Sequence, residues 1–265
     1  MRDKVQLNPV TTVAFVLFHA GAVAALFFFT WPMLLLAAGM VILSGCPGVG
    51  MGFHRLLTHR SYKTSKWVEY LLTICGSLSL QGGEIWWVTW HRIHHKYTEM
   101  VGSDPHTPRE GKFWSHMGWL IWNDPALHDR IILSKYAPEL CRDPFHRTLN
   151  RMAWVPTAVL GLILLWFGGP VALMWGMFVP VVAGWHSTWL VNSATHLWGL
   201  QPFQTAATGD SRNNWWVALI TFGEGWHNNH HAFPTSARHG FTAIQFDPNW
   251  YGIKLLRFLR LAWDV

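Results

Sequence analysis

The sequence predicts an all-α integral membrane protein with four transmembrane helices in two hairpins and a cytosolic helical cap. Three observations support this fold class. Only 13% of the 265 residues are charged while 51% are hydrophobic, whereas about 25% of the residues in typical soluble domains are charged. Two long segments, 5–54 and 152–209, contain no Asp, Glu, Lys or Arg. Nine of the 16 histidines are concentrated in a few short motifs close to, but outside, the most apolar stretches.

Each charge-free segment predicts one helical hairpin of two membrane spans. A Thr-Trp-Pro break divides the first segment and a Gly-Gly-Pro break divides the second. Each of the four pieces approaches the roughly 20 residues that cross the hydrocarbon core of a bilayer as a helix. The alternative is a pair of buried helical hairpins in a soluble core, which the absence of charge over such lengths disfavours. The expected spans are about 10–29, 33–51, 152–167 and 171–191.

The positions of the basic residues predict the orientation in the membrane. All 20 Lys and Arg lie outside the two segments, and neither hairpin turn carries a charge. By the positive-inside rule, the N-terminus and the regions 54–151 and 192–265 then lie on the cytoplasmic side. We therefore expect a single membrane domain over 1–265, with both termini and the cap in the cytoplasm.

The stretch 66–90 is apolar enough to lie on a membrane, is rich in Trp and contains two Glu. We expect it to form an interfacial helix rather than a fifth span. A fifth span would place the histidine motifs before and after it on opposite sides of the membrane.

The net charge of +6 and the pI near 9.5 could indicate a nucleic-acid-binding protein. The basic residues are dispersed, however, and no recognition motif accompanies them. We therefore predict no nucleic-acid partner and an attraction to anionic membrane lipids instead. The three cysteines form no CxxC pair and give no sign of a disulfide or a cysteine-ligated metal.

Three histidine boxes and one isolated histidine indicate a metal site. The boxes read HRLLTH from His54, HRIHH from His91 and HNNHH from His227, and the isolated His196 follows Asn192 by four residues. Neutral imidazole is the commonest metal ligand in proteins. Because one first-row ion takes about four to six donors, nine histidines predict a di-metal site held by the cap.

The spacing within the boxes fits ligands presented from helices. Successive residues of an α-helix turn by about 100°, so positions i, i+3 and i+4 share one face. The second and third boxes fit this spacing, although a single box of this kind could also be a polar helix face. His54 and His59 are five residues apart and do not fit. We expect them to bracket the end of the second span or to contact the metals from different sides.

The donor type narrows the chemistry further. Zinc hydrolases with HExxH motifs place a Glu after the first His, and soluble di-iron bundles use Glu ligands. Neither HxxHH box has such a Glu, and we expect a site with almost no carboxylate, with Glu84, Asp104 and Glu224 as the nearest acids in sequence. Nitrogen ligands alone are compatible with Fe, Zn, Cu or Ni.

Together, these motifs resemble those of the membrane fatty acyl desaturase family. The boxes, with Asn192-Ser-Ala-Thr-His196 and Gly223-Glu-Gly-Trp-His227, are similar to its Δ9 branch, which includes stearoyl-CoA desaturases and bacterial or cyanobacterial acyl-lipid desaturases. The resemblance extends over about 50–250. The Ser211-Arg-Asn-Asn-Trp-Trp stretch is most similar to the bacterial, cyanobacterial and plant members.

The resemblance implies a non-haem centre of two Fe, although Zn can displace Fe(II) from nitrogen ligands in a purified sample. It implies O₂-dependent removal of hydrogen from C9 and then C10 of a saturated C16–C18 acyl chain, which gives a cis double bond and water. The implied ligands are nine histidines and one asparagine that acts through water: His54, His59, His91, His94, His95, His196, His227, His230, His231 and Asn192.

An unactivated methylene offers no charge to hold, so shape and burial must position the acyl chain. The resemblance places Gln81, Trp87 and Thr188 where related desaturases bend the acyl chain beside the metals. Ten tryptophans could wall a narrow tunnel, although at least half of them could instead form an interfacial aromatic belt. They are Trp86, Trp87, Trp90, Trp114, Trp119, Trp122, Trp185, Trp189, Trp215 and Trp216.

The resemblance also implies a fatty acyl-CoA or acyl-lipid substrate, O₂ and two electrons per turnover. Animal acyl-CoA members carry an Arg-Asp pair just before the second box, where this chain has Thr89-Trp90. This difference argues against binding of a CoA headgroup, and the acyl carrier stays open between CoA, acyl carrier protein and glycerolipid. No haem, Rossmann or Cys-cluster motif is present, so we expect a separate electron donor of the ferredoxin, flavodoxin or cytochrome b5 type.

Six of the other seven histidines have simpler interpretations. We expect one of them to pack between helices and two to lie at the surface. Three others are expected to be structural or to support the ligands without being ligands. In this order, they are His19; His128 and His146; and His106, His116 and His239.

Two alternatives to a desaturase remain at this point. One is another membrane di-iron oxygenase, such as a hydroxylase, ketolase or alkane monooxygenase, which has similar boxes but a different product. The other is a histidine-rich metal transporter. A transporter needs ligands near the bilayer midplane, whereas the boxes lie beyond the ends of the predicted spans.

Overall fold

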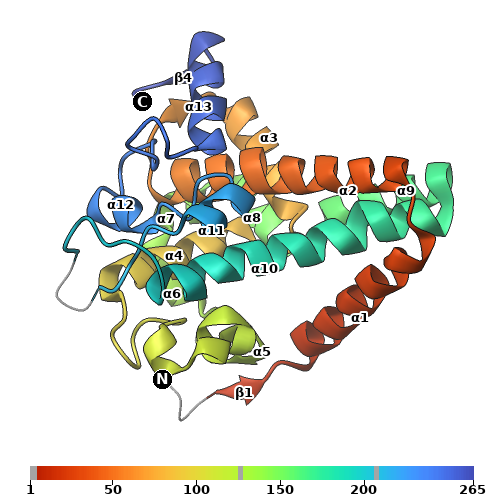
Figure 1. The fold of residues 1–265 in the computed structure, drawn as a ribbon, viewed down its shortest axis with the longest axis horizontal. Helices are drawn as coiled ribbons and strands as arrows, with labels where there is room; N and C mark the ends of the chain where they lie inside the picture. Colours follow the sequence, from red (N-terminus) through yellow and green to blue (C-terminus); the bar gives the residue numbers. More distant parts are fainter. Residues whose placement is uncertain (1–4, 125–127, 206–208) are drawn as a thin grey trace.

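The computed structural model describes residues 5–124, 128–205 and 209–265, and it is mostly helical. Long helices lie alongside one another in one half of the molecule, and short helices and loops form a cap over their ends in the other half (Figure 1). Among the described residues, three helices are long and apolar enough to cross a membrane: Pro9–Phe28, Trp31–Thr58 and Val155–His196.

The first two membrane helices begin at side-chain caps. The Asn8 side chain accepts a hydrogen bond from the Thr11 backbone, and Thr30 caps the second helix in the same way, with a proline in the first turn of each. The predicted Thr-Trp-Pro break is therefore the start of the second helix. The elements are α1 (Pro9–Ala25) with the 3-10 turn η2 (Leu26–Phe28), and α2 (Trp31–Leu43) with the π-helix η3 (Ser44–Thr58).

The third membrane helix folds back on itself at the predicted Gly-Gly-Pro break. Gly169 has a φ of 69°, which favours glycine. Gly161, which precedes Gly169 in the chain, packs against Met177, which follows it. Residues 161 and 177 would be about 24 Å apart in a straight helix, so the two halves form a hairpin. The elements are α9 (Val155–Leu173), the π-turn η7 (Met174–Phe178), α10 (Val179–Ser193) and the 3-10 turn η8 (Ala194–His196).

Close packing against α3 (Lys66–Ser77) buries the end of the second membrane helix. A Cβ atom at Gly48 would lie 2.6 Å from the backbone carbonyl carbon of Cys75, so only glycine permits this approach. The helix continues to Thr58, beyond the predicted end at residue 51. The predicted cap therefore begins as a direct extension of the span.

The stretch 66–90, which we expected to form one interfacial helix, is instead two helices. The helix α3 ends at Ser77, and α4 (Glu84–Tyr97) begins after a turn in which Leu80 and Gly82 have φ values of 50° and 90°. The expectation of a single helix is wrong because this turn redirects the chain, so that α4 carries the second box into the cap. The first helix does expose apolar side chains, since Trp67 is 58% exposed.

Short helices complete the cap and connect its loops. The helix α12 carries the third histidine box, and α13 packs beside the end of the second membrane helix. The short helices of the cap are η4 (Pro108–Glu110), η5 (Trp114–Gly118), α5 (Trp119–Ile121), α6 (Arg130–Tyr136), α7 (Pro138–Arg142), α8 (Pro144–Arg151), α11 (Trp215–Ile220), α12 (His227–Ala232) and α13 (Pro248–Phe258).

Two short antiparallel ladders depart from the all-α prediction. The strand β1 (Gln6–Leu7) pairs with β3 (Trp122–Asn123), and β2 (Lys63–Thr64) pairs with β4 (Ala262–Trp263). They fasten the two ends of the described chain to the cap. Strands of two residues are too short to produce the alternation of polar and apolar residues by which a sequence reveals a strand.

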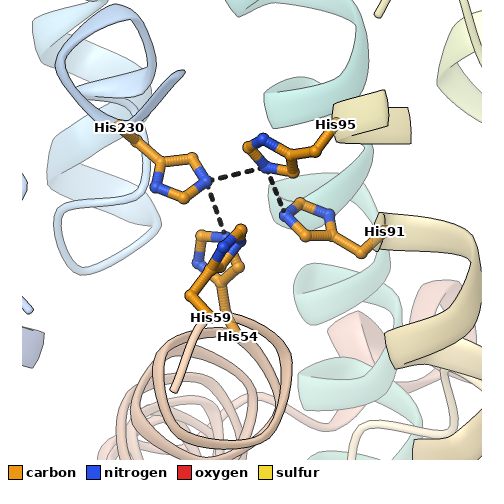
Figure 2. A group of neighbouring side chains, drawn as sticks. All are labelled: His54, His59, His91, His95 and His230. Atoms are coloured by element: carbon orange, nitrogen blue, oxygen red, sulfur yellow. Dashed lines mark hydrogen bonds between the residues drawn. The ribbon is translucent and has the colours of Figure 1, made fainter. Parts of the chain in front are cut away.

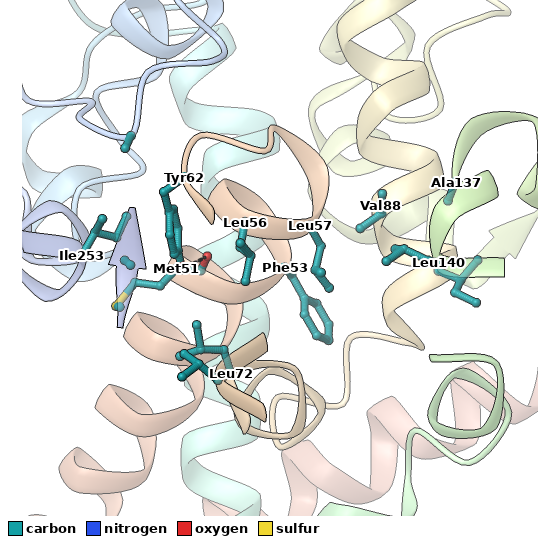
Figure 3. Close-up of a cluster of buried hydrophobic side chains, with 14 residues drawn as sticks. Met51, Phe53, Leu56, Leu57, Tyr62, Leu72, Val88, Ala137, Leu140 and Ile253 are labelled. Atoms are coloured by element: carbon teal, nitrogen blue, oxygen red, sulfur yellow. Dashed lines mark hydrogen bonds between the residues drawn. The ribbon is translucent and has the colours of Figure 1, made fainter. Parts of the chain in front are cut away.

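The main apolar core lies in the cap, beside the end of the second membrane helix (Figure 3). Phe53 from η3, Val88 from α4 and Ile253 from α13 are fully buried in it. Leu140 from α7 is also part of this core. The core therefore holds together the helices that carry the first and second histidine boxes.

A buried ionic group joins α3, α4 and α8, against the expectation that His146 lies at the surface. His146 is fully buried, and its two ring nitrogens lie 3.0 Å from Glu84 Oε1 and 3.0 Å from Glu69 Oε1. Burial opposes a charged imidazole, but the two carboxylates outweigh it and raise the pKa of His146 to about 9. The expectation is wrong because these partners are distant in sequence. His128 is exposed, as expected.

We expect the stability of the protein to fall as the pH rises through about 9. The His146 pKa of about 9 in the folded state exceeds the unfolded value of about 6.5. The stabilisation is therefore complete below the unfolded pKa and is lost as the pH rises through the folded pKa. Between about pH 7 and 10, the Tm in detergent should decrease more for the wild type than for His146→Gln, which cannot titrate. Equal decreases in the two proteins would contradict this assignment.

Candidate metal centre

All nine histidines of the motifs converge in the cap, where they form two adjacent clusters. In Figure 2, the rings of the five-histidine cluster point toward a common centre. His95 and His231, which belong to different clusters, have ring centroids only 4.4 Å apart. Within each cluster, one ligand atom per residue lies within 4.8 Å of the others. The five-histidine cluster is His54, His59, His91, His95 and His230, and the four-histidine cluster is His94, His196, His227 and His231.

The Nε2 atoms face one another inside each cluster. In the five-histidine cluster, His230 Nε2 lies 3.2 Å from His54 Nε2 and 2.9 Å from His95 Nε2. In the four-histidine cluster, His227 Nε2 lies 2.9 Å from the same atom of His196. Such convergence of one nitrogen per ring is the arrangement that a metal ion requires.

The second and third boxes each contribute to both clusters. On α4, His91 and His95 belong to the five-histidine cluster while His94 belongs to the other. The third box is divided in the same way, with only His230 in the five-histidine cluster. At about 100° per residue, position i+4 lies about 40° to one side of position i, and i+3 about 60° to the other. The shared helix face that the spacing predicted therefore spans two centres.

His54 and His59 lie in the same cluster because the helix that carries them is a π-helix. The His59 backbone N–H donates to His54 O at 3.1 Å, which is the i→i+5 pattern of a π-helix. One π-turn therefore separates the two rings, whose centroids are 4.8 Å apart. The two residues do bracket the helix end, since η3 stops at Thr58. The alternative of contact from different sides is not found.

A carboxylate lies behind three of the histidines, on the ring edge that faces away from the clusters. Because a carboxylate accepts the proton on Nδ1, the lone pair of Nε2 is left directed at the cluster, as in metal-binding histidines. The three pairs are His54 Nδ1–Glu224 Oε2 at 2.5 Å, His94 Nδ1–Asp104 Oδ2 at 2.9 Å and His196 Nδ1–Glu99 Oε1 at 2.7 Å.

The sequence analysis did not predict these carboxylate partners. It names Asp104 and Glu224 only as acids near the boxes, and the third such acid, Glu84, contacts His146 instead. Glu99 was missed, although it is fully buried and follows directly after the helix that carries the second box. Its place four residues after His95 is the sequence signal that could have found it. In the structure, Glu99 lies in a tight turn with a φ of 60°.

A buried arginine holds the carboxylate behind His54. Arg55 is fully buried, with Nε 3.1 Å from Glu224 Oε1 and Nη2 2.9 Å from Asp247 Oδ1. Burial would raise the pKa of Glu224, but the charge of Arg55 outweighs it and holds this pKa well below its usual value. Neighbouring residues of one helix thus supply both a candidate ligand and the counter-charge for its acidic partner.

Several of the clustered imidazoles favour the neutral form, which is the form that binds a metal ion. Burial, and then repulsion from neighbouring histidines, lowers the pKa of His91, His95 and His227 well below the usual value. The Nε2 atom of His59 is buried and has no hydrogen-bond partner among the described residues. Four or five neutral nitrogen donors match the coordination of a first-row divalent ion. The residues of each cluster therefore fit one ion.

Two cavities meet beside the five-histidine cluster. One of about 320 Å³ is lined by residues of α1, α4 and α10, and one of about 60 Å³ by residues of α2, η3 and α10. Gln81 Nε2 donates to Thr188 Oγ1 at 2.9 Å, and Trp87 Nε1 donates to Gln81 Oε1 at 3.3 Å. These three residues line both cavities, together with His91 and Asn192. The structure brings the three residues together beside His91, and a role in bending an acyl chain there stays a prediction.

The tryptophans divide between the cavity and the surface. Trp215 is 69% exposed, in keeping with an aromatic belt. The expectation that an aromatic belt accounts for at least half of the ten tryptophans is wrong. Six of them line the larger cavity: Trp86, Trp87, Trp90, Trp119, Trp185 and Trp189.

The family model described as fatty acid desaturase matches residues 29–245. This chain belongs to the fatty acid desaturase family. The desaturase is 44% identical to an sn-1 stearoyl-lipid 9-desaturase of Anabaena variabilis, over 99% of this chain and 95% of the relative. It is 42% identical to an sn-2 palmitoyl-lipid 9-desaturase of Nostoc sp. (strain 36), over 98% and 90%. It is also 42% identical to an acyl-CoA C20 Delta5-desaturase of Anemone leveillei, over 89% and 75%.

These findings make the chain an oxidoreductase with a histidine-rich site that can hold metal. The names of the three relatives cover two double-bond positions and two kinds of acyl carrier. Membership of the family therefore leaves both the position and the carrier to be argued from the site.

We expect each histidine cluster of the desaturase to hold one metal ion. His196→Ala removes one donor from the four-histidine cluster and should lower the bound metal from about two ions per chain to about one. His128→Ala changes an exposed histidine outside both clusters and should keep the wild-type content. Elemental analysis of the purified proteins by mass spectrometry measures this difference. Wild-type metal content in His196→Ala would refute the division into two sites.

Proposed function

We propose that this desaturase uses O₂ to introduce a cis double bond at the Δ9 position of a saturated C16–C18 acyl chain, at a di-iron centre. The main observation behind the proposal is the junction of the two cavities, where Gln81, Trp87 and Thr188 meet His91 of the five-histidine cluster. A largely apolar tunnel suits an alkyl chain, and clusters of neutral histidines suit two ions that react with O₂.

In this proposal each histidine cluster holds one iron, and Asn192 acts through a water molecule. Asn192 lines both cavities and lies one helical turn before His196. Bound iron supplies the oxidising power, drawn from O₂, that breaking a C–H bond of an unactivated methylene requires.

The residues of this chain position the acyl chain and exclude water. The Gln81–Thr188 hydrogen bond lies where the cavities meet, so the acyl chain bends beside His91. The Trp87 ring stacks on His91 with centroids 5.0 Å apart and an interplanar angle of 19°. This contact ties the wall of the tunnel to a candidate ligand. Holding C9 and C10 in one place converts a choice among many similar methylenes into a single product.

The balance of the reaction defines the other partners. One acyl chain, one O₂, two electrons and two protons give the alkene and two waters. The electrons come from a separate donor of the ferredoxin, flavodoxin or cytochrome b5 type. We propose that the donor docks on the cap, which the positive-inside rule places in the cytoplasm.

We propose four membrane crossings, with both termini and the metal centre on the cytoplasmic side. The reversal at Gly169 divides the third membrane helix into two crossings. Large apolar side chains near the two hairpin turns support this arrangement, since Phe27 is 82% exposed and Trp166 is 84% exposed. Such exposure suits lipid contact.

The larger cavity favours an acyl-lipid over acyl-CoA as the substrate. No Asp, Glu, Lys or Arg is among the described residues that line it. Its lining includes Asn8 and Thr11, where α1 begins, so the acyl chain enters at the level of the lipid headgroups. Thr89 and Trp90 are buried and offer no charge to a CoA headgroup. The proposed Δ9 position agrees with the names of two relatives, which are 9-desaturases, whereas the third relative is a Delta5-desaturase.

Expression in a host that lacks unsaturated C16–C18 acyl chains and contains a competent electron donor tests this function. Mass spectrometry of the membrane lipids should detect new Δ9 monoenes with the native chain and none with His94→Ala, which removes a donor of the four-histidine cluster. Hydroxylated lipids would instead support a hydroxylase, and monoenes at another position would contradict the Δ9 assignment. Conversion of supplied stearoyl-CoA but not of glycerolipid would overturn the proposed carrier.

Filling the smaller cavity should shorten the acyl chains that the enzyme accepts. Val41 lines this cavity of about 60 Å³, so Val41→Phe removes space for the methyl end. We expect the ratio of C18 to C16 products to fall about tenfold, because two buried methylenes contribute about 1.6 kcal/mol. Val16→Phe changes an exposed valine of α1 and should keep the ratio. Gas chromatography of the products measures it, and an unchanged ratio in Val41→Phe would place the methyl end elsewhere.

A further inference from the structure

Three histidines outside the metal centre form a hydrogen-bonded chain with Ser193. His19 Nε2 lies 3.0 Å from His186 Nε2, and His186 Nδ1 lies 3.0 Å from His116 Nε2. His116 Nδ1 lies 3.0 Å from Ser193 Oγ. At the other end, His19 Nδ1 lies 2.6 Å from the carbonyl oxygen of Phe15. This histidine chain joins α1 to α10 and to η5.

Two members of the histidine chain lie inside membrane helices. His19 and His186 occur in segments that contain no Asp, Glu, Lys or Arg. Ionisable residues within membrane segments are rare, pair with one another and mark functional sites. Neither residue belongs to the five- or four-histidine cluster. Metal binding therefore does not explain these two residues. His19 lies between helices, as expected, and its contact with α10 is polar, to His186.

For neutral imidazoles, the Phe15 carbonyl sets the direction of the hydrogen bonds among the three histidines. The Phe15 carbonyl can only accept, so His19 Nδ1 carries the proton and His19 Nε2 accepts. Because a neutral imidazole has one donor and one acceptor nitrogen, His186 and His116 each donate through Nε2 and accept through Nδ1. Ser193 Oγ lies 3.0 Å from His116 Nδ1 and 2.8 Å from the Trp189 carbonyl oxygen, so its one hydroxyl proton goes to one of these two acceptors. The chain ends at a backbone carbonyl, where a proton cannot leave, so it links helices and does not conduct protons.

The histidine chain lies behind the aromatic wall of the larger cavity. Phe15, Trp185 and Trp189 line that cavity. The Phe15 ring packs on Trp185 and Trp189 with centroids 4.8 Å and 5.0 Å apart, and His186 contacts Trp189 at 5.1 Å. His19 lies one turn after Phe15 on α1. Because α1 supplies one side of the cavity and α10 another, the histidine chain sets the separation of the two sides.

We propose that His19, His186, His116 and Ser193 are positioning residues that hold α1 against α10 and thereby determine which acyl carbons lie at the metal centre. The inference rests on the proposed desaturase function of the cavity. C9 and C10 carry no polar group, so the choice of carbon depends on the rigidity of the tunnel wall. When the link is broken, α1 separates from α10 more readily and the double bond spreads to neighbouring carbons.

Hydrogen exchange of the purified protein tests the link without any reaction. His19→Phe removes both hydrogen bonds of His19 and keeps an aromatic ring. Exchange of the backbone amides in 9–25 should become at least about threefold faster, the effect of losing one average interhelical hydrogen bond in a membrane protein. His19→Gln should restore slow exchange, because its amide both donates and accepts.

Thr157→Ala is the matched control. It removes another buried interhelical hydrogen bond, from Thr157 Oγ1 to Ser77 O at 3.1 Å, and Thr157 does not line either cavity. Exchange in 9–25 should stay at the wild-type rate in this variant. Wild-type exchange in His19→Phe would overturn the link itself.

The products then decide whether the link positions the acyl chain or only stabilises the fold. Iron-loaded His19→Phe should convert a single monoene into a mixture of neighbouring positions, while Thr157→Ala should keep the single product even if its Tm falls as much. Faster exchange with an unchanged product position would overturn the positioning role. If His19→Phe does not accumulate, Ser193→Ala removes one hydroxyl at the other end and should spread the products likewise. A wild type that makes no monoene refutes the desaturase function, whereas the exchange result still decides the link.

Discussion

The structure depends on one electrostatic constraint: nine imidazole rings, five buried and four half-buried, lie together, where a proton on one ring would repel its neighbours. An unprotonated imidazole nitrogen has a lone pair that needs a partner, and in both clusters Nε2 atoms face one another, as His230 faces His95 at 2.9 Å and His196 faces His227 at 2.9 Å. Carboxylates on the outer edges of His54, His94 and His196 accept the Nδ1 protons of these three rings. One metal ion in each cluster would satisfy this arrangement.

The same helices carry candidate metal ligands and the wall of the proposed acyl tunnel. On α4, Trp87 and His91 are four residues apart, and on α10 Thr188 and Asn192 have the same spacing. Each pair therefore lies on one helix face, and both pairs line the junction of the cavities. A shift of either helix would move the tunnel wall and the candidate ligand together. In the proposed function, this arrangement would let the enzyme act at one position without polar contacts at the reacting carbons.

The sequence predicted the features that depend on local patterns. Charge-free segments and the Gly-Gly-Pro break indicate the membrane helices, and the histidine motifs contain the nine histidines that the structure brings together. The remaining features depend on contacts distant in sequence or on unusual backbone. A π-turn joins His54 to His59, and no periodicity of 3.6 residues reveals it. The burial of His146 depends on Glu69 and Glu84, which lie on other helices, and two-residue strands leave no detectable pattern.

X-ray absorption at the metal K-edge tests the central claim most directly, because it reports the atoms bound to the metal without reference to any product. For the protein loaded with zinc, we expect a first shell of four to five nitrogen atoms at about 2.0–2.1 Å, with the outer scattering of imidazole rings. A first shell dominated by oxygen or sulfur would contradict the account, because the two histidine clusters would then not be the ligands.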